Sequence, residues 1–150
     1  MKSSKLLVLP RIFVGVIFLV ASYSKSVVPV SVQMFGLLNR GGADPGFAWY
    51  RNFTHSVVLP HVGVFGSLLL LGEIYVGLAL VFGITTRLAA AVAIFLLLNF
   101  MCAKEAFPWN PSICDSPDIV LCLVIMIGAA GRTWGIDRLL HARYPSALIW

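Results

Sequence analysis

The sequence predicts an all-α membrane protein: a four-transmembrane-helix bundle with short interfacial helices in the first outer loop. Apolar residues make up 59% of the 150 residues and charged residues only 11%, whereas a soluble domain carries about 25% charged residues. The apolar residues also gather into four runs that are separated by turn-forming and basic residues. A single membrane domain (residues 1–150) accounts for the whole chain.

The first predicted span covers about residues 6–23 and is apolar except for Arg11 and its last two residues. Lys2 and Lys5 precede it, as they would in a secretion signal. However, Pro10 and Arg11 interrupt the apolar run, and no A-x-A cleavage site follows it. These features favour a retained helix over a cleaved signal.

A long connection follows, at about residues 25–59. Aromatic residues such as Phe35 and Trp49 punctuate it, and Asp44-Pro45 is typical of a helix start. We therefore expect one or two short helices here, which lie in the membrane interface or cap the bundle.

The second span is predicted at about residues 60–82, a length that crosses a hydrocarbon core of about 30 Å. Glu73 is its single charge. Gly83 suits the end of this helix, and Thr85 or Thr86 suits the N-cap of the third span, at about residues 87–102. Such a short turn makes the two helices antiparallel neighbours.

The fourth span is predicted at about residues 118–134. Ser116, Pro117 and Asp118 are typical of an N-cap, a first helical position and a first-turn acid. We expect the span to end in the interface near Trp134. Pairs of small residues four apart suggest helix contacts, although ordinary membrane composition also produces them: Gly63 with Ser67, and Ala89 with Ala93.

The basic residues predict the orientation, because cytoplasmic loops are enriched in Lys and Arg. Seven fall on one side of the predicted bundle and four on the other. The seven are Lys2, Lys5, Arg11, Arg87, Arg132, Arg138 and Arg143; the four are Lys25, Arg40, Arg51 and Lys104. This predicts a multi-pass protein of the bacterial plasma (inner) membrane with both termini in the cytoplasm. The charge lies between apolar segments, so it indicates the lipid bilayer as partner and no nucleic acid.

Three polar residues inside the spans are candidate site residues: Arg11, Glu73 and Asn99. A charge in hydrocarbon costs about 3 kcal/mol on insertion scales, so each should face the bundle and find a partner. Their depths are compatible with one polar cluster that joins three helices. Such a cluster can be purely structural and fix helix register, or it can form a ligand, quinone or proton site.

The cysteines form a second candidate group, near the outer side. Cys102 and Cys114 can form a structural disulfide, a redox-active pair or remain free thiols, and the lack of a C-x-x-C motif speaks against the redox pair. Cys122 lies one turn into the fourth span. No metal-binding motif is present, and the histidines lie outside the positions that bis-histidine haem ligation would need.

Several short motifs occur in order along the chain. They are Arg11-Ile12-Phe13-Val14-Gly15 followed by Ser24-Lys25, Leu59-Pro60-His61, Gly72-Glu73 with Gly77-Leu78-Ala79-Leu80, Gly83-Ile84-Thr85-Thr86-Arg87, Asn99, and Ala130-Gly131-Arg132 with Gly135-Ile136-Asp137. This ordered set resembles the DoxX/DoxD group of small bacterial and archaeal membrane proteins, over nearly the whole chain.

The resemblance implies a four-helix membrane bundle in which Arg11, Glu73, Arg87, Asn99, Arg132 and Asp137 are the functional positions. Some members of the group are named as the small subunit of a thiosulfate:quinone oxidoreductase. The expected function is therefore a membrane subunit that supports quinone-linked or thiol-linked oxidoreduction, with a non-covalent quinone and a protein partner subunit or homo-oligomer. Two alternatives remain: a non-catalytic scaffold or assembly factor, and a small transporter in which Glu73 lines the pathway.

Overall fold

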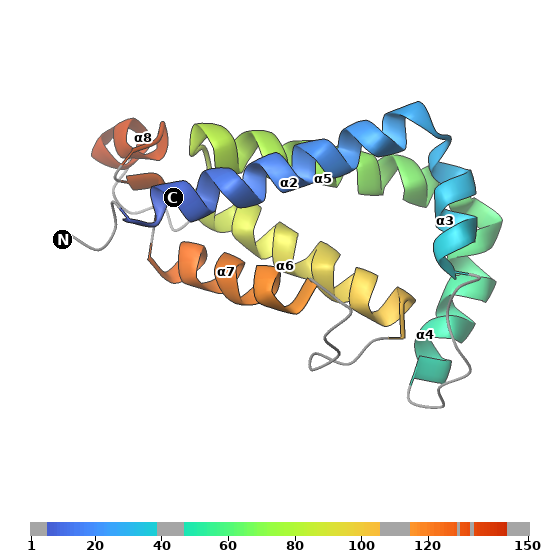
Figure 1. Cartoon of the computed structure of the whole chain (residues 1–150). Coiled ribbons are helices and arrows are strands. Elements are labelled where there is room, and N and C mark those ends of the chain that lie inside the picture. The colour runs from blue at the N-terminus through green and yellow to red at the C-terminus, as the bar shows by residue number, and fades with distance from the viewer. Residues whose placement is uncertain (1–5, 39–46, 106–114, 129, 133, 144–150) are drawn as a thin grey trace.

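Every regular element in the described part of the chain is a helix (Figure 1). A computed structural model describes residues 6–38, 47–105, 115–128, 130–132 and 134–143. Three helices in these ranges are long and apolar enough to cross a membrane: α2 (Val8–Val27), the continuous helix Ala48–Phe82 that contains α5 (Val62–Phe82), and α6 (Thr86–Ala103). The all-helical membrane protein predicted from composition is confirmed.

The outer faces of these helices are apolar. Leu9, Leu71 and Phe95, one from each helix, are 76%, 64% and 64% exposed. In water such a surface would be an aggregation hazard, whereas in hydrocarbon it is the surface that lipid requires. The protein therefore contacts the bilayer through its long helices.

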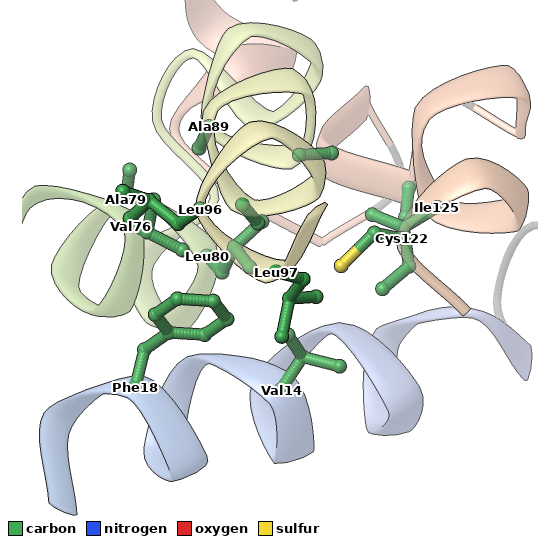
Figure 2. Packing of buried hydrophobic residues seen from close by; sticks show 13 residues of the cluster. Val14, Phe18, Val76, Ala79, Leu80, Ala89, Leu96, Leu97, Cys122 and Ile125 are labelled. Atoms are coloured by element: carbon green, nitrogen blue, oxygen red, sulfur yellow. The ribbon is translucent and has the colours of Figure 1, made fainter. Parts of the chain in front are cut away.

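The helices pack around one core. In turn, α2 packs against α5, α5 against α6, α6 against α7 (Asp115–Ile127), and α7 against α2. Figure 2 shows the core side chains of all four helices pointing toward one another. They include Val14, Phe18, Val76, Leu80, Leu96, Leu97, Cys122 and Ile125.

The closest backbone approach lies between α2 and α5, at Gly15 and Gly77. A Cβ added at Gly15 would lie 3.0 Å from the Gly77 carbonyl oxygen, and one added at Gly77 would lie 3.1 Å from the Gly15 carbonyl oxygen. The predicted contact at Gly63 and Ser67 is wrong, because both are exposed and nothing lies near Gly63. Ala89 and Ala93, in contrast, are fully buried as expected.

The connection between the first two spans is more helical than the sequence suggested. α2 continues to Val27, so Lys25 lies in its last turn rather than in a loop. After Pro29 comes α3 (Val30–Leu38). α4 (Ala48–Phe53) then runs without a break through a π-helical turn (Thr54–Val58) and a 3₁₀ turn (Leu59–His61) into α5.

The predicted start of the second span at residue 60 is therefore not a helix boundary. Pro60 cannot donate the hydrogen bond of an α-helical turn, and helices absorb such a residue through local π and 3₁₀ turns. The observed π turn and 3₁₀ turn lie at this point.

The turn between α5 and α6 follows the prediction at Gly83 and departs from it at the threonines. Gly83 ends α5 in the left-handed conformation, with φ of 68°. Thr85 occupies the N-cap position of α6, but its side chain makes no capping hydrogen bond. Another residue supplies that cap, as described below.

The region of the predicted fourth span is divided. α7 begins at Asp115, three residues before the predicted start, and ends at Ile127; at thirteen residues it spans about 20 Å. A 3₁₀ turn (η4, Ala130–Arg132) and α8 (Asp137–Arg143) follow. In Figure 1 α8 lies beside the start of α2, and α3 and α4 lie at the opposite end of the bundle.

Candidate functional site

A buried ion pair joins the end of α2 to the middle of α5. The Nζ of Lys25 lies 2.7 Å from the Oε1 of Glu73, and their side chains are 16% and 1% exposed. α2 and α5 run in opposite directions (Figure 1). Helical side chains lean toward their own N-terminus, so the Lys25 side chain leans into the bundle and Glu73 leans toward it. The second oxygen of Glu73, Oε2, is buried and has no hydrogen-bond partner in the described part of the chain.

A second ammonium–carboxylate pair joins the residue just after α6 to the start of α7. The Nζ of Lys104 is 2.6 Å from the Oδ2 of Asp115, with side chains 37% and 13% exposed. The ring of Phe100 is close to both pairs, because Lys25 Nζ is 5.4 Å and Lys104 Nζ is 6.0 Å from its centroid. Both distances are in the range of cation–π contacts.

These groups line one cavity of about 530 Å³, which is in the range of small-molecule sites, about 300–1,000 Å³. Its walls come from α2, α3, α5, α6 and α7. The apolar lining includes Ile17, Phe18, Ala21, Val32, Leu69, Leu97 and Phe100, and the polar lining is Lys25, Gln33, Glu73, Lys104, Asp115 and Asp118. An apolar wall with a few convergent polar groups is typical of a ligand site.

Arg11 and Asn99 do not join Glu73 in the single cluster expected from sequence. Arg11 is 2% exposed, and its Nη1 and Nη2 donate to the carbonyl oxygens of Ala130 (3.2 Å) and Trp134 (2.7 Å). These acceptors follow α7, at the far end of the bundle from Lys25. The depth argument was wrong because it paired residues inside the spans and left out the backbone of the irregular segment after α7.

Asp137 forms a second junction at this same end. Its carboxylate accepts hydrogen bonds from the backbone N–H groups of Thr85 (2.6 Å) and Thr86 (2.8 Å), and so it caps α6 from α8. Its own N–H donates to the carbonyl of Gly83 at 2.8 Å. A Cβ on Gly131 would lie 2.2 Å from Asp137 Oδ2, so only glycine leaves room for this carboxylate.

Asn99 lies nearer the surface, on α6. Its Oδ1 accepts from the Tyr50 hydroxyl at 3.3 Å, and its Nδ2 donates to the carbonyl of Phe95 at 2.7 Å. An ion pair between Arg51 and Glu105 also joins α4 to the residues just after α6. Asn99 thus helps to anchor α4, rather than extending the contacts of Glu73.

The structure describes some of the remaining candidate residues and not others. Arg87 is half-buried in the first turn of α6. Arg132 ends η4, and its side chain lies outside the described residues. Cys102 is half-buried near the end of α6 and Cys122 is fully buried in α7. Cys114 lies outside the described residues, so its pairing with Cys102 stays a prediction.

Lys25 is the site residue that the sequence argument did not select, since the first span was ended before it. The signal was present, because the Ser24-Lys25 motif belongs to the family resemblance and Glu73 needed a cation within reach.

Long apolar helices around a cavity with a buried ion pair define a small helical membrane protein with a candidate ligand site. The DoxX family model matches residues 6–103, which include all three candidate spans together with Lys25 and Glu73. The chain belongs to the DoxX family. No solved structure matches the chain.

Proposed function

We propose that this DoxX protein is a membrane subunit that supports quinone-linked oxidoreduction, and that the cavity beside Lys25 and Glu73 takes the quinone ring. The observation that carries the proposal is a buried ion pair on the wall of a cavity that is otherwise largely apolar. Quinones are apolar and arrive through lipid, so a cavity between membrane helices is accessible to them.

The residues on the cavity wall suit a ring that carries oxygen atoms. A quinone takes up two electrons and two protons when it is reduced. Lys25 can donate a hydrogen bond to a ring oxygen, and Glu73 is placed to exchange a proton with it. Phe100 offers an aromatic face for the ring. An electron donor on a partner subunit would supply the two electrons. If that donor is a thiol, the function is thiol-linked oxidoreduction.

The proposal includes a topology. We propose that α7 and η4 together form the fourth span, and that α3 and α4 lie at the outer interface. Arg11, Arg87 and Arg138 then lie at the cytoplasmic end with both termini, in a bacterial inner membrane, as the excess of basic residues favours.

The test measures direct binding of a quinone to the purified protein in detergent micelles. A short-tailed 1,4-benzoquinone should bind, and this binding should be lost or strongly weakened in the double variant Lys25→Met/Glu73→Leu, which removes the hydrogen-bond donor to the ring oxygen without leaving an unpaired charge. The matched control is Glu105→Gln, which alters another poorly exposed carboxylate (6% exposed) in an ion pair that does not line the cavity. Equal binding of benzoquinone by the double variant and by Glu105→Gln would contradict the site. If the protein binds no quinone and a partner protein copurifies with it, the scaffold alternative is supported.

A further inference from the structure

Glu73 and Lys25 together present an acceptor and a donor at one point of the cavity wall. Lys25 has three N–H donors, and one of them is used by Glu73 Oε1. Glu73 Oε2 has no hydrogen-bond partner in the described residues. The torsion that orients a carboxylate plane is broad, so Oε2 can turn toward the cavity that Glu73 lines without strain.

This combination discriminates between two oxygen groups. A carbonyl oxygen only accepts, so it can bind Lys25 but leaves Oε2 without a partner. A hydroxyl both donates and accepts, so it can satisfy Glu73 Oε2 and Lys25 Nζ at once. An unpaired buried acceptor carries a large penalty, especially when it is charged. The pair should therefore favour a hydroxyl over a carbonyl.

The second pair extends the argument to the other side of the ring. Lys104 and Asp115 line the same cavity, and the Phe100 ring is within cation–π distance of the ammonium groups of both pairs. A 1,4-dihydroxy aromatic ring has one hydroxyl at each end and a flat face between them. Such a ring offers one hydroxyl to each of the two donor–acceptor pairs and a face to the aromatic side chain beside them.

We propose that the cavity binds the reduced, 1,4-dihydroxy form of the ring more tightly than the oxidised dicarbonyl form, with one hydroxyl at Lys25–Glu73 and the other at Lys104–Asp115. This inference rests on the proposed function, because it concerns the same cavity. It adds that the site stabilises the product of quinone reduction, so the bound ring is easier to reduce than the free ring.

The experiment compares three probes on the full-length chain in micelles under anaerobic conditions. They are a short-tailed 1,4-benzoquinone, its hydroquinone, and the dimethyl ether of that hydroquinone, which has the same ring without O–H donors. The hydroquinone should bind at least about tenfold more tightly than the other two, since hydrogen bonds to charged groups have this magnitude. Redox titration should then show a midpoint potential of the bound ring raised by at least about 30 mV.

The variants separate the two pairs. Glu73→Gln should lose most of the preference for hydroquinone, Asp115→Asn should lose a smaller part because its pair is more exposed, and Glu105→Gln should keep it all. If Glu73→Gln does not fold, the comparison with the dimethyl ether on the unmodified chain decides.

Two results would overturn the inference, and they differ in what else they overturn. Equal or tighter binding of the dicarbonyl form would refute the preference and leave the quinone site standing. Failure of all three probes to bind would refute the proposed function together with it.

Discussion

At the scale of single residues, the Lys25–Glu73 pair is a buried ion pair in which each partner depends on the other. The Glu73 side chain is 1% exposed and the Lys25 side chain is 16% exposed. Removing one partner of a buried pair leaves an uncompensated charge, whereas removing both together can be nearly neutral. This asymmetry gives a test that needs no ligand.

Lys25→Met should lower the free energy of unfolding by about 3 kcal/mol or more, because it keeps the length of the side chain and removes the cation. Adding Glu73→Leu to Lys25→Met should restore most of that loss. Lys104→Met is the control, and it should cost less than about 1 kcal/mol because its pair is more exposed. Denaturant titration in mixed micelles measures all three. Equal losses in the single and the double variant would show that the pair is not the source of the effect.

The sequence identified the polar residues of the interior correctly and paired them wrongly. Arg11 and Glu73 had to be buried, because no apolar span tolerates a charge on its lipid face at low cost. Their partners depend on packing that no local pattern encodes: the carbonyls of Ala130 and Trp134 lie 119 and 123 residues after Arg11 in the chain. The role of Arg11 and Glu73 in a ligand site stays a prediction.

At the scale of elements, the approach of α2 to α5 depends on Gly15 and Gly77. The nearest atoms to an added Cβ at Gly15 include backbone atoms at 3.0 Å, and backbone cannot move aside as a flexible side chain does. Small residues at such points allow the close packing on which helix association in lipid relies. The two predicted pairs of small residues each lie within a single helix, and neither includes Gly15 or Gly77, because a contact between two helices is not visible in the spacing along one of them.

Gly15→Ala should therefore destabilise the protein by about 1–3 kcal/mol, because the two helices must separate to admit the methyl group. Gly63→Ala is the matched control on α5, where nothing lies within 4 Å of the added Cβ. It should leave stability unchanged or raise it slightly, since alanine favours helix. Unfolding in micelles compares the two, and equal effects would contradict the assigned contact.

The cap of α6 gives another test of an element. Asp137→Ala removes the acceptor for two backbone N–H groups of α6, which should cost about 1–2 kcal/mol and speed hydrogen exchange at Thr85 and Thr86. Arg138→Ala, on an exposed neighbour in α8, should change neither quantity. Unaltered exchange at both threonine amides in Asp137→Ala would refute the cap.

Helix ends were predictable where the deciding residue is local. Gly83 ends α5 as expected, because a left-handed residue after a helix favours glycine. The continuous helix from Ala48 to Phe82 was missed, because Pro60 normally marks a boundary and its accommodation needs a π turn that the sequence does not announce. The true cap of α6 was missed for a similar reason, since Asp137 is distant in sequence.

At the scale of the whole molecule, the topology follows from whether α7 crosses the membrane. In a chain with its native cysteines replaced, Pro117→Cys and Arg138→Cys lie on either side of α7, and both positions are exposed. An impermeant maleimide added to whole cells should label Pro117→Cys, together with Ser56→Cys at the outer end. It should label Arg138→Cys only after permeabilisation. Labelling of Pro117→Cys and Arg138→Cys from the same side would mean that α7 does not span.

The contacts of Arg11 also bear on how the protein is made. Arg11 leaves the ribosome well before the carbonyls that bind it, which lie 119 and 123 residues later in the chain, and before the nearby carboxylate of Asp137. During translation the guanidinium must find other partners, in the insertion machinery or at the lipid headgroups, until the segment after α7 has been made. Final assembly of this helical bundle is thereby coupled to the synthesis of the segment that follows α7.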